Sequence, residues 1–340
     1  ISKKFLYVYK NLKIQVYTVY HPEKLNRRVE NSTEEGNSMN DLIEIKGLNK
    51  YYGKKQALCD INLTIRQGMF GLLGRNGAGK TTLMKTLACL LPKKDGEIRV
   101  CGIPIENAGE IRRIIGYLPQ EFSMYPTMSV AEAMDYLGIL SGLAAVERRQ
   151  RTDRLLEKVN LTDQRHKKIK ALSGGMKRRL GIAQALLNDP RVLIVDEPTA
   201  GLDPEERIRF RNLLSELAED RIVILSTHIV GDIEAACEDI AILNQGKVVY
   251  NGTVEQLLDT ARGKVFTKVT DRAESNKLKQ ELTVTGMHVQ GKKIHLRYLS
   301  DKAQPDAESA EPNIEDSYTW CLLAHGVREL PSREDMGGDK

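Results

Sequence analysis

The sequence predicts an α/β protein built on a largely parallel, buried sheet, followed by a smaller α+β unit. Short, β-rich runs, most of them continuously apolar, recur at residues 61–65, 69–73, 114–118, 192–195 and 222–225. Helical patterns lie between these runs, and this alternation is typical of a parallel sheet covered on both faces. The length of 340 residues is enough for one large domain and one smaller one.

The composition excludes several classes of protein. With 41 % apolar and 29 % charged residues, the chain has the make-up of a globular domain, and its net charge of +5 separates no class of anionic partner from another. The five cysteines stand singly, without the spacing of a zinc site or a disulfide framework, which predicts a reducing compartment. Since no stretch approaches about 18 uninterrupted apolar residues, we expect the chain not to cross a bilayer itself.

The sequence pattern divides the chain into four parts: an N-terminal segment, a large domain, a small extension and a tail. Residues 1–38 carry no motif, and Met39 opens the first strand pattern. We expect residues 1–38 to be a non-native or disordered arm and Met39 the natural start, since residues 34–36 can be encoded by a purine-rich ribosome-binding sequence; a genuine N-terminal arm is the alternative. The large domain is predicted at 39–262, with a helical subdomain at about 121–180 whose helices lie near 129–140 and 147–159.

A small α+β extension is predicted at residues 263–325. Its patterns indicate a strand at 265–269, a helix at 271–281 and strands at 284–289 and 293–298. The apolar run at 318–323 interrupts an acidic tail and should dock against the rest of the protein. Residues 326–340 are predicted to be a flexible tail.

The first motif that carries chemistry is a phosphate-binding loop. Residues 74–81 read Gly-Arg-Asn-Gly-Ala-Gly-Lys-Thr, which fits G-x-x-x-x-G-K-[ST] between an apolar strand and a helical run at 82–91. Backbone amides at such a helix start converge on phosphate oxygens, Lys80 adds a positive charge for the β and γ phosphates, and the Thr81 hydroxyl suits Mg²⁺. The residues predicted to bind the nucleotide here are Gly74, Asn76, Gly77, Ala78, Gly79, Lys80, Thr81 and Thr82.

An acidic pair follows the apolar strand at 192–195. Asp196, at the carboxyl end of the strand, is predicted to hold Mg²⁺, and Glu197 to accept a proton from the attacking water. A solvated strand end is the alternative for the pair taken alone. Together with the phosphate loop, the pair predicts hydrolysis of a nucleoside triphosphate.

A third motif makes the family resemblance specific. Residues 172–176 read Leu-Ser-Gly-Gly-Met, which is similar to the signature of ABC ATPases. Further pieces stand in that family's order: Tyr-Tyr-Gly at 51–53, a glutamine at 120, Ala-Gly-Leu-Asp at 200–203 and Ser-Thr-His at 226–228. The resemblance covers roughly residues 42–255 and implies a P-loop ATPase core with a β-rich N-terminal part, a helical signature subdomain and the C-terminal extension.

The resemblance implies roles for these further residues. The Tyr52 ring offers a face to adenine, Gln120 completes the Mg²⁺ shell beside Thr81 and Asp196, and His228 contacts the γ phosphate. The implied catalytic residues are Glu197, His228, Lys80 and Gln120, and the implied cofactors are ATP and Mg²⁺. The signature residues, Ser173, Gly174 and Gly175, would complete the ATP site of a second subunit, with Asp203 communicating across the interface.

The resemblance also implies partners and a location. The segment after Gln120 and the residues around 311–316 look like bacterial single-module exporters of the ABC-2 type. A separate multi-spanning permease, a second ATP-binding subunit in a homodimer, and a peripheral position on the cytoplasmic face of the membrane are therefore expected, and no nucleic acid. The alternative is a non-transport ABC ATPase acting on ribosomes or nucleic acid, although 52 residues between Gln120 and Ser173 leave no room for a long coiled coil.

Two local features depart from the commonest pattern. Met176 stands where glutamine is usual, so a hydrogen bond made there by glutamine is lost, and we expect hydrolysis to survive. A basic cluster surrounds the signature, and we interpret it as a solvated helical face rather than a nucleic-acid site. Its members are Lys167, Lys168, Lys170, Lys177, Arg178 and Arg179.

Overall fold

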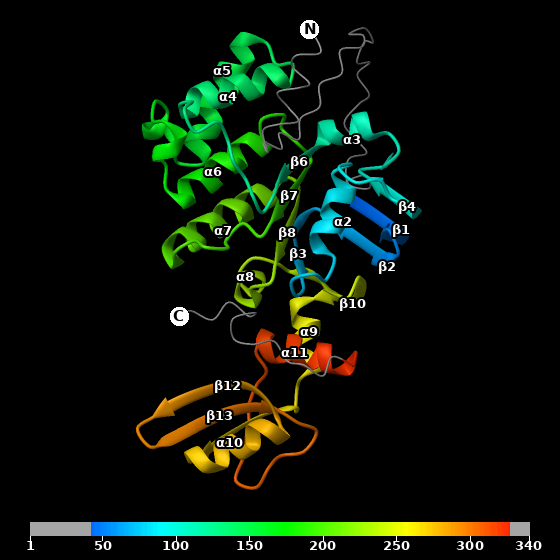
Figure 1. The fold of residues 1–340 in the computed structure, drawn as a ribbon, viewed down its shortest axis with the longest axis vertical. Coiled ribbons are helices and arrows are strands. Elements are labelled where there is room, and N and C mark those ends of the chain that lie inside the picture. Colours follow the sequence, from blue (N-terminus) through cyan, green and yellow to red (C-terminus); the bar gives the residue numbers. More distant parts are fainter. Residues whose placement is uncertain (1–41, 327–340) are drawn as a thin grey trace. The chain divides into compact units, whose positions relative to one another are not determined.

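The computed structural model describes residues 42–326, in two compact units. The first unit comprises residues 42–69 and 81–226, and the second comprises residues 70–80 and 227–326 (Figure 1). The predicted arm at 1–38 and the predicted tail, apart from Gly326, lie outside the described residues.

The first unit carries an antiparallel sheet of strand order β2-β1-β4-β5. Its strands are β1 (Leu42–Tyr52), β2 (Lys55–Arg66), β4 (Asp95–Val100) and β5 (Ile103–Pro104). Buried Ile61, Leu63 and Ile65 alternate with exposed residues on β2, as expected of a sheet with one solvated face. The strand predicted at 61–65 is confirmed and begins six residues before that run, but it was expected in the parallel sheet and instead belongs to this antiparallel one, as its alternating burial requires.

Three parallel strands form the centre of the first unit. They are β6 (Ile115–Leu118), β7 (Val192–Asp196) and β8 (Ile222–Thr227), in register from β6 to β7 and from β7 to β8. Nearly every residue of these strands is buried, which confirms the strands predicted from their apolar runs. Because parallel strands end at one edge, the residues after Leu118, the carboxylate of Asp196 and the hydroxyl of Ser226 gather there.

The first unit also contains helices α3 (Ala108–Ile114), α4 (Val130–Leu140), α5 (Ala145–Lys158), α6 (Gly174–Ala185) and α7 (Pro204–Ala218), with short 3-10 helices η1 (Thr162–Gln164) and η2 (Ile169–Ala171). Helices α3 and α6 contact β6, whereas α4 and α5 contact each other and α6. The capping box between Ser129 and Glu132 starts α4, and its buried residues recur at helical spacing. The helices predicted near 129–140 and 147–159 are confirmed as α4 and α5.

The second unit begins with most of β3 (Gly68–Leu73). This strand pairs in parallel with β9 (Asp239–Asn244), which pairs in antiparallel with β10 (Lys247–Thr253). Helix α8 (Val230–Glu234) lies close to β3 at Gly71, where an added Cβ would be 2.6 Å from Ile233. Helix α9 (Val254–Thr260) then leads into the C-terminal extension.

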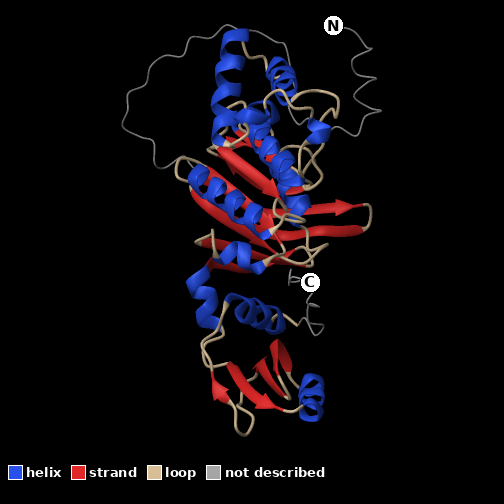
Figure 2. Ribbon diagram, turned by 90° about the vertical axis from the view of Figure 1, so that its left-hand side faces the viewer, coloured by secondary structure: helices blue, strands red, loops and turns tan. Residues whose placement is uncertain are grey.

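The extension is a four-stranded antiparallel sheet of order β12-β13-β11-β14 with a helix on one face (Figure 2). Its elements are β11 (Val265–Thr270), α10 (Arg272–Glu281), β12 (Thr283–Gln290), β13 (Lys293–Leu299) and β14 (Glu308–Ser309). Leu278 of α10 packs against Ile294 and Leu296 of β13. The predicted order of strand, helix, strand, strand is confirmed.

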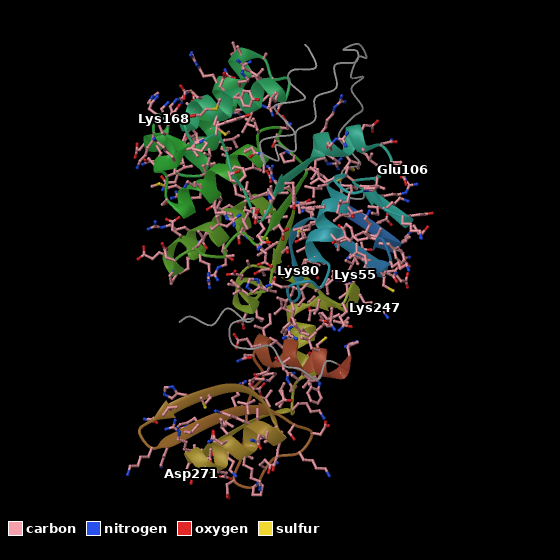
Figure 3. All side chains as sticks on the ribbon, in the orientation of Figure 1. Lys55, Lys80, Glu106, Lys168, Lys247 and Asp271 are labelled. Carbon is pink, nitrogen blue, oxygen red and sulfur yellow. The ribbon has the colours of Figure 1, made fainter. Side chains whose placement is uncertain are left out.

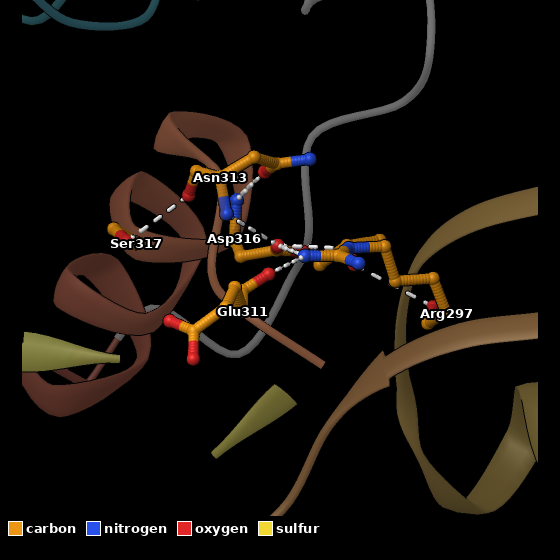
Figure 4. A network of polar contacts seen from close by, with 6 residues as sticks. Arg297, Glu311, Asn313, Asp316 and Ser317 are labelled. Carbon is orange, nitrogen blue, oxygen red and sulfur yellow. Dashed lines mark hydrogen bonds and ion pairs between the residues drawn. The ribbon is translucent and has the colours of Figure 1, made fainter. Parts of the chain in front are cut away.

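The last helix, α11 (Ile314–Ala324), contains the apolar run at 318–323. Trp320 and Leu323 pack against the core formed by Ala261, Val265 and Leu299, so the predicted docking is confirmed. Arg297 and Asn313 bind the carboxylate of Asp316 at the start of this helix (Figure 4). Among residues 42–326, no helix combines the length and apolarity that a membrane span needs.

Candidate active site

The phosphate loop lies in the second unit, between β3 and helix α2 (Lys80–Leu87). The Lys80 ammonium is buried and donates a hydrogen bond to the Gly74 carbonyl at 2.5 Å, which keeps it over the loop (Figure 3). Gly79 has φ +111°, a conformation that side chains rarely adopt. At Gly74 an added Cβ would meet the Leu243 carbonyl at 2.4 Å, so glycine is required there by the neighbouring strand β9.

Helix α2 places the loop's polar residues in its first turn. Lys80, Thr81 and Thr82 are consecutive helical residues, so their amides belong to the positive end of the helix. The predicted helix at 82–91 begins two residues earlier and ends four residues earlier. It ends at Leu87 because the chain turns at Cys89, whose φ is +55°.

A cavity of about 900 Å³ lies within the first unit. Four predicted site residues line it: Thr81, Gln120, Gly174 and Asp196. They come from the start of α2, the segment after β6, the start of α6 and the end of β7, so the cavity brings together positions up to 115 residues apart in the sequence.

The oxygen atoms in this cavity fit Mg²⁺. Mg²⁺ prefers hard oxygen ligands and keeps several waters, so one carboxylate with a hydroxyl and an amide oxygen is a suitable set. Asp196 is fully buried, and the Ser226 hydroxyl donates to its Oδ1 at 3.2 Å, which orients the carboxylate. Thr81 and Gln120 line the same cavity and add the hydroxyl and the amide oxygen.

The backbone at Glu197 is strained. Its φ is +48°, in the left-handed region that is costly for residues with a Cβ. The Glu197 amide donates to the Ser226 carbonyl at 2.9 Å, and its side chain is 3 % exposed. Ser226 of the neighbouring strand β8 therefore holds both acidic residues. Its hydroxyl binds the Asp196 carboxylate, and its backbone carbonyl accepts from the Glu197 amide. A glutamate at this position does not predict a left-handed backbone, whereas glycine or asparagine would have suggested one.

The signature residues form the start of α6. Ser173 is the N-cap, and its Oγ accepts a hydrogen bond from the Met176 amide at 3.2 Å. The helix begins at Gly174, because this cap lets the two glycines take part in the first turn. Ser173 and Gly174 are exposed, and the first amides of a helix lack partners within the helix.

Helix α7 lies against the signature at Gly175. An added Cβ on Gly175 would be 2.5 Å from a carboxylate oxygen of Glu206, so the glycine permits this approach. Asp203 is the exposed N-cap of α7 and accepts from the Glu206 amide at 2.9 Å. The signature and the residue predicted to communicate across an interface are thus joined through Glu206.

The interpretation of the basic cluster as a solvated face is wrong for two of its members. Arg179 is buried, donates to the carbonyls of Val159 and Asn160, and lies 3.4 Å from Glu206. Arg178 lines the cavity, where burial lowers the pKa of its guanidinium and the charges of the acidic pair oppose that shift. Lys167, Lys168 and Lys170 are exposed, as predicted. Helical spacing could have identified Arg178 as a site residue, because residues 174, 178 and 181 share one face of α6.

The remaining predicted residues lie at the ends of strands. Tyr52 ends β1 with 49 % of its surface exposed, and the Lys50 ammonium is 5.8 Å from its ring centre. The neighbouring Tyr51 ring is covered more closely, by Lys94 at 4.6 Å. His228 follows β8 in the second unit and is half-buried.

Comparison with known proteins gives matches over this whole region. A family model described as "ABC transporter" matches residues 58–200. The probable multidrug ABC transporter ATP-binding protein YbhF of Escherichia coli is 33 % identical over 314 residues, which is 86 % of this chain and 54 % of that protein. The linearmycin resistance ATP-binding protein LnrL of Bacillus subtilis is 36 % identical over 232 residues, 67 % of this chain and 75 % of that protein. The chain thus spans about half the length of YbhF and three quarters of LnrL.

Solved structures agree. The structure of cbiO1 from Clostridium perfringens, described as part of the ABC transporter complex cbiONQ, matches with a TM-score of 0.61 and 28 % identity, covering 65 % of this chain and 91 % of that one. The dimeric structure of MJ0796, a bacterial ABC transporter cassette, matches with a TM-score of 0.57 and 28 % identity, covering 62 % and 98 %. The predicted α/β fold is confirmed by these likenesses, and the chain belongs to the family of ABC transporter ATP-binding proteins.

Proposed function

We propose that this chain binds and hydrolyses ATP with Mg²⁺ and energises export through a separate membrane permease. The observation that carries the proposal is the cavity that brings Thr81, Gln120 and Asp196 together. Those three positions are a loop hydroxyl, an amide and a buried carboxylate, and each has a use in holding a metal-bound triphosphate.

The chain's own residues divide the work of hydrolysis. The amides of residues 74–80 and the Lys80 ammonium bind the phosphates, and the open face of the Tyr52 ring takes the adenine. Glu197, held by strand β8, accepts the proton of the attacking water, and His228 stabilises the charge that develops on the γ phosphate. Mg²⁺ bound to the oxygens of Thr81, Gln120 and Asp196 would neutralise phosphate charge.

The exposed start of α6 supports a shared site. The amides at its start suit the phosphates of a nucleotide held by a second copy of the chain. Asp203 caps the neighbouring helix α7, whose Glu206 lies against Gly175 of the signature. We therefore propose a homodimer with two ATP sites, located on the cytoplasmic face of the membrane. ATP would close the dimer and hydrolysis would reopen it, which would move the permease between its two states.

Membrane partnership is tested by purification from the native host. The tagged protein is extracted from membranes in mild detergent, and the proteins present in stoichiometric amount are identified by mass spectrometry. A multi-spanning partner is expected, and the purified complex should hydrolyse ATP only with Mg²⁺ or Mn²⁺. Recovery with ribosomes or DNA and without a membrane protein would replace the transport function by the non-transport alternative.

A further inference from the structure

We infer that Arg178 is a positioning residue of the ATPase site, which ties the Gln120 segment to the signature helix α6 and places a positive charge toward Asp196 and Glu197. The inference rests on the proposed function. It adds to that function a direct mechanical link between the signature and Gln120, within one copy of the chain.

The first observation is a hydrogen bond to the residue before Gln120. Nη1 of Arg178 donates to the Pro119 carbonyl at 3.2 Å. Pro119 is buried and directly follows the last residue of β6. As a proline it has no amide hydrogen to donate. A guanidinium hydrogen bond to this carbonyl therefore restrains the peptide unit that joins Pro119 to Gln120.

The second observation is close packing one turn further along α6. At Gly181 an added Cβ would lie 2.6 Å from Leu118 and 3.2 Å from Phe122. The glycine lets both side chains press against the helix. Leu118 and Phe122 each lie two residues from Gln120, so α6 contacts the segment on both sides of Gln120 and through the Pro119 carbonyl.

The third observation is electrostatic. Arg178 lines the cavity together with Asp196, and Glu197 follows Asp196 directly in the chain, so the guanidinium shares one cavity with the start of the acidic pair. Lys85 and Lys177 also line the cavity, and Glu121 is the other acidic residue of its lining. A fixed positive charge facing the acidic pair lowers the attraction of the site for a divalent cation, and it stabilises the two carboxylates when no cation is bound.

These contacts give Arg178 a place in the reaction cycle. Ser173 and Gly174 start the same helix that holds the Gln120 segment. When α6 shifts as the signature binds or releases phosphate, Gln120 must follow, because its flanks are attached to residues 178 and 181. The signature of one copy would thereby report to the Gln120 of that same copy.

The test compares three variants of the full chain. Arg178→Met keeps the apolar length of the side chain and removes both the charge and the donors, whereas Arg178→Lys keeps the charge and one donor. The control is Arg149→Gln, which changes an exposed arginine of α5 outside the cavity lining. Hydrogen exchange of a peptide covering residues 115–125 reports on positioning, and Mn²⁺ binding beside a non-hydrolysable ATP analogue, followed by electron paramagnetic resonance, reports on charge.

We expect Arg178→Met to raise exchange in residues 115–125 by about tenfold, as the loss of a charge-assisted hydrogen bond predicts. The same variant should bind Mn²⁺ about threefold more tightly or better, because a repelling charge is gone. Arg178→Lys should keep the parent Mn²⁺ affinity, because the charge remains, and should bring exchange back to within about threefold of the parent value. Arg149→Gln should match the parent protein in both measurements.

The inference is overturned if Arg178→Met matches Arg149→Gln in both measurements. It is also overturned if Arg178→Met lowers the melting temperature, raises exchange equally throughout α6 and leaves Mn²⁺ affinity unchanged, because the residue would then only stabilise the fold. Should Arg178→Met fail to fold, Arg178→Gln removes the charge alone, and unchanged Mn²⁺ affinity then decides against the inference. Absence of ATP turnover in the parent protein would refute the proposed function, whereas the exchange measurement does not depend on turnover.

Discussion

Nη2 of Arg297 lies 2.5 Å from Oδ2 of Asp316, and Nε of the same guanidinium lies 2.9 Å from that oxygen. The Asp316 carboxylate is fully buried and also accepts from the Thr285 hydroxyl and the Asn313 amide. Arg297 donates further to the Glu311 carbonyl (Figure 4). One ion pair therefore joins β13 to the start of α11.

Asp316→Ala should destabilise the C-terminal extension by about 3–5 kcal/mol, because it leaves Arg297 partly buried without its carboxylate. Urea unfolding followed by the fluorescence of Trp320, the only tryptophan in the chain, measures this loss. Asp301→Ala is the matched control, since Asp301 forms an exposed pair with Lys264 and should cost about 1 kcal/mol or less. Equal losses in the two variants would contradict a stabilising role for the buried pair.

Lys80→Ala should abolish productive binding or hydrolysis of ATP. The substitution removes the positive charge that is held over the phosphate loop, and alanine at this helix position leaves the fold intact. Binding of a fluorescent ATP analogue and phosphate release are measured together. Lys55→Ala changes an exposed lysine of β2 and should leave both unchanged. Turnover by Lys80→Ala at the parent rate would reject the phosphate-loop assignment.

Glu197→Gln should preserve ATP binding and slow hydrolysis by about 10² to 10⁴, the usual contribution of a general base. The glutamine keeps the size and the backbone of the buried glutamate but accepts no proton. Because ATP then stays bound, the variant should form a dimer at saturating ATP, measured by light scattering with and without nucleotide. A variant that binds ATP and remains a monomer would count against the shared sites.

The sequence predicted those parts of the fold and site that depend on local pattern. The strands at 192–195 and 222–225 were evident because both faces of a central parallel strand are buried, so the run is continuously apolar. The cavity residues Thr81, Gln120 and Asp196 were named from motifs whose chemistry needs those residue types. The register of β7 against β8, which sets Ser226 beside Asp196, depends on tertiary pairing that no local pattern encodes.

The basic cluster was interpreted wrongly because neighbours in the sequence are not neighbours on the surface of a helix. Lys177, Arg178 and Arg179 read as one basic run, although a helix turns about 100° per residue and sends adjacent side chains to different surroundings. Arg179 is buried and donates to carbonyls of residues about twenty positions earlier in the chain. A contact between residues so far apart in the sequence cannot be inferred from a local pattern. The start of α6 is likewise set by a single local contact, because two glycines are poor helix formers and the Ser173 cap outweighs that preference.

The left-handed backbone of Glu197 makes a prediction about stability that is independent of catalysis. At φ +48° a Cβ is unfavourable by about 1–2 kcal/mol, and glycine escapes this cost. Glu197→Gly should therefore be more stable than Glu197→Ala by about 1 kcal/mol in thermal or urea unfolding. Asn212, exposed within α7, is the control: there the order must reverse, with alanine the more stable by about 1 kcal/mol. If alanine were the better residue at both positions, Glu197 would not be strained, and its geometry would follow from ordinary turn preferences instead of from the hold of strand β8 on its amide.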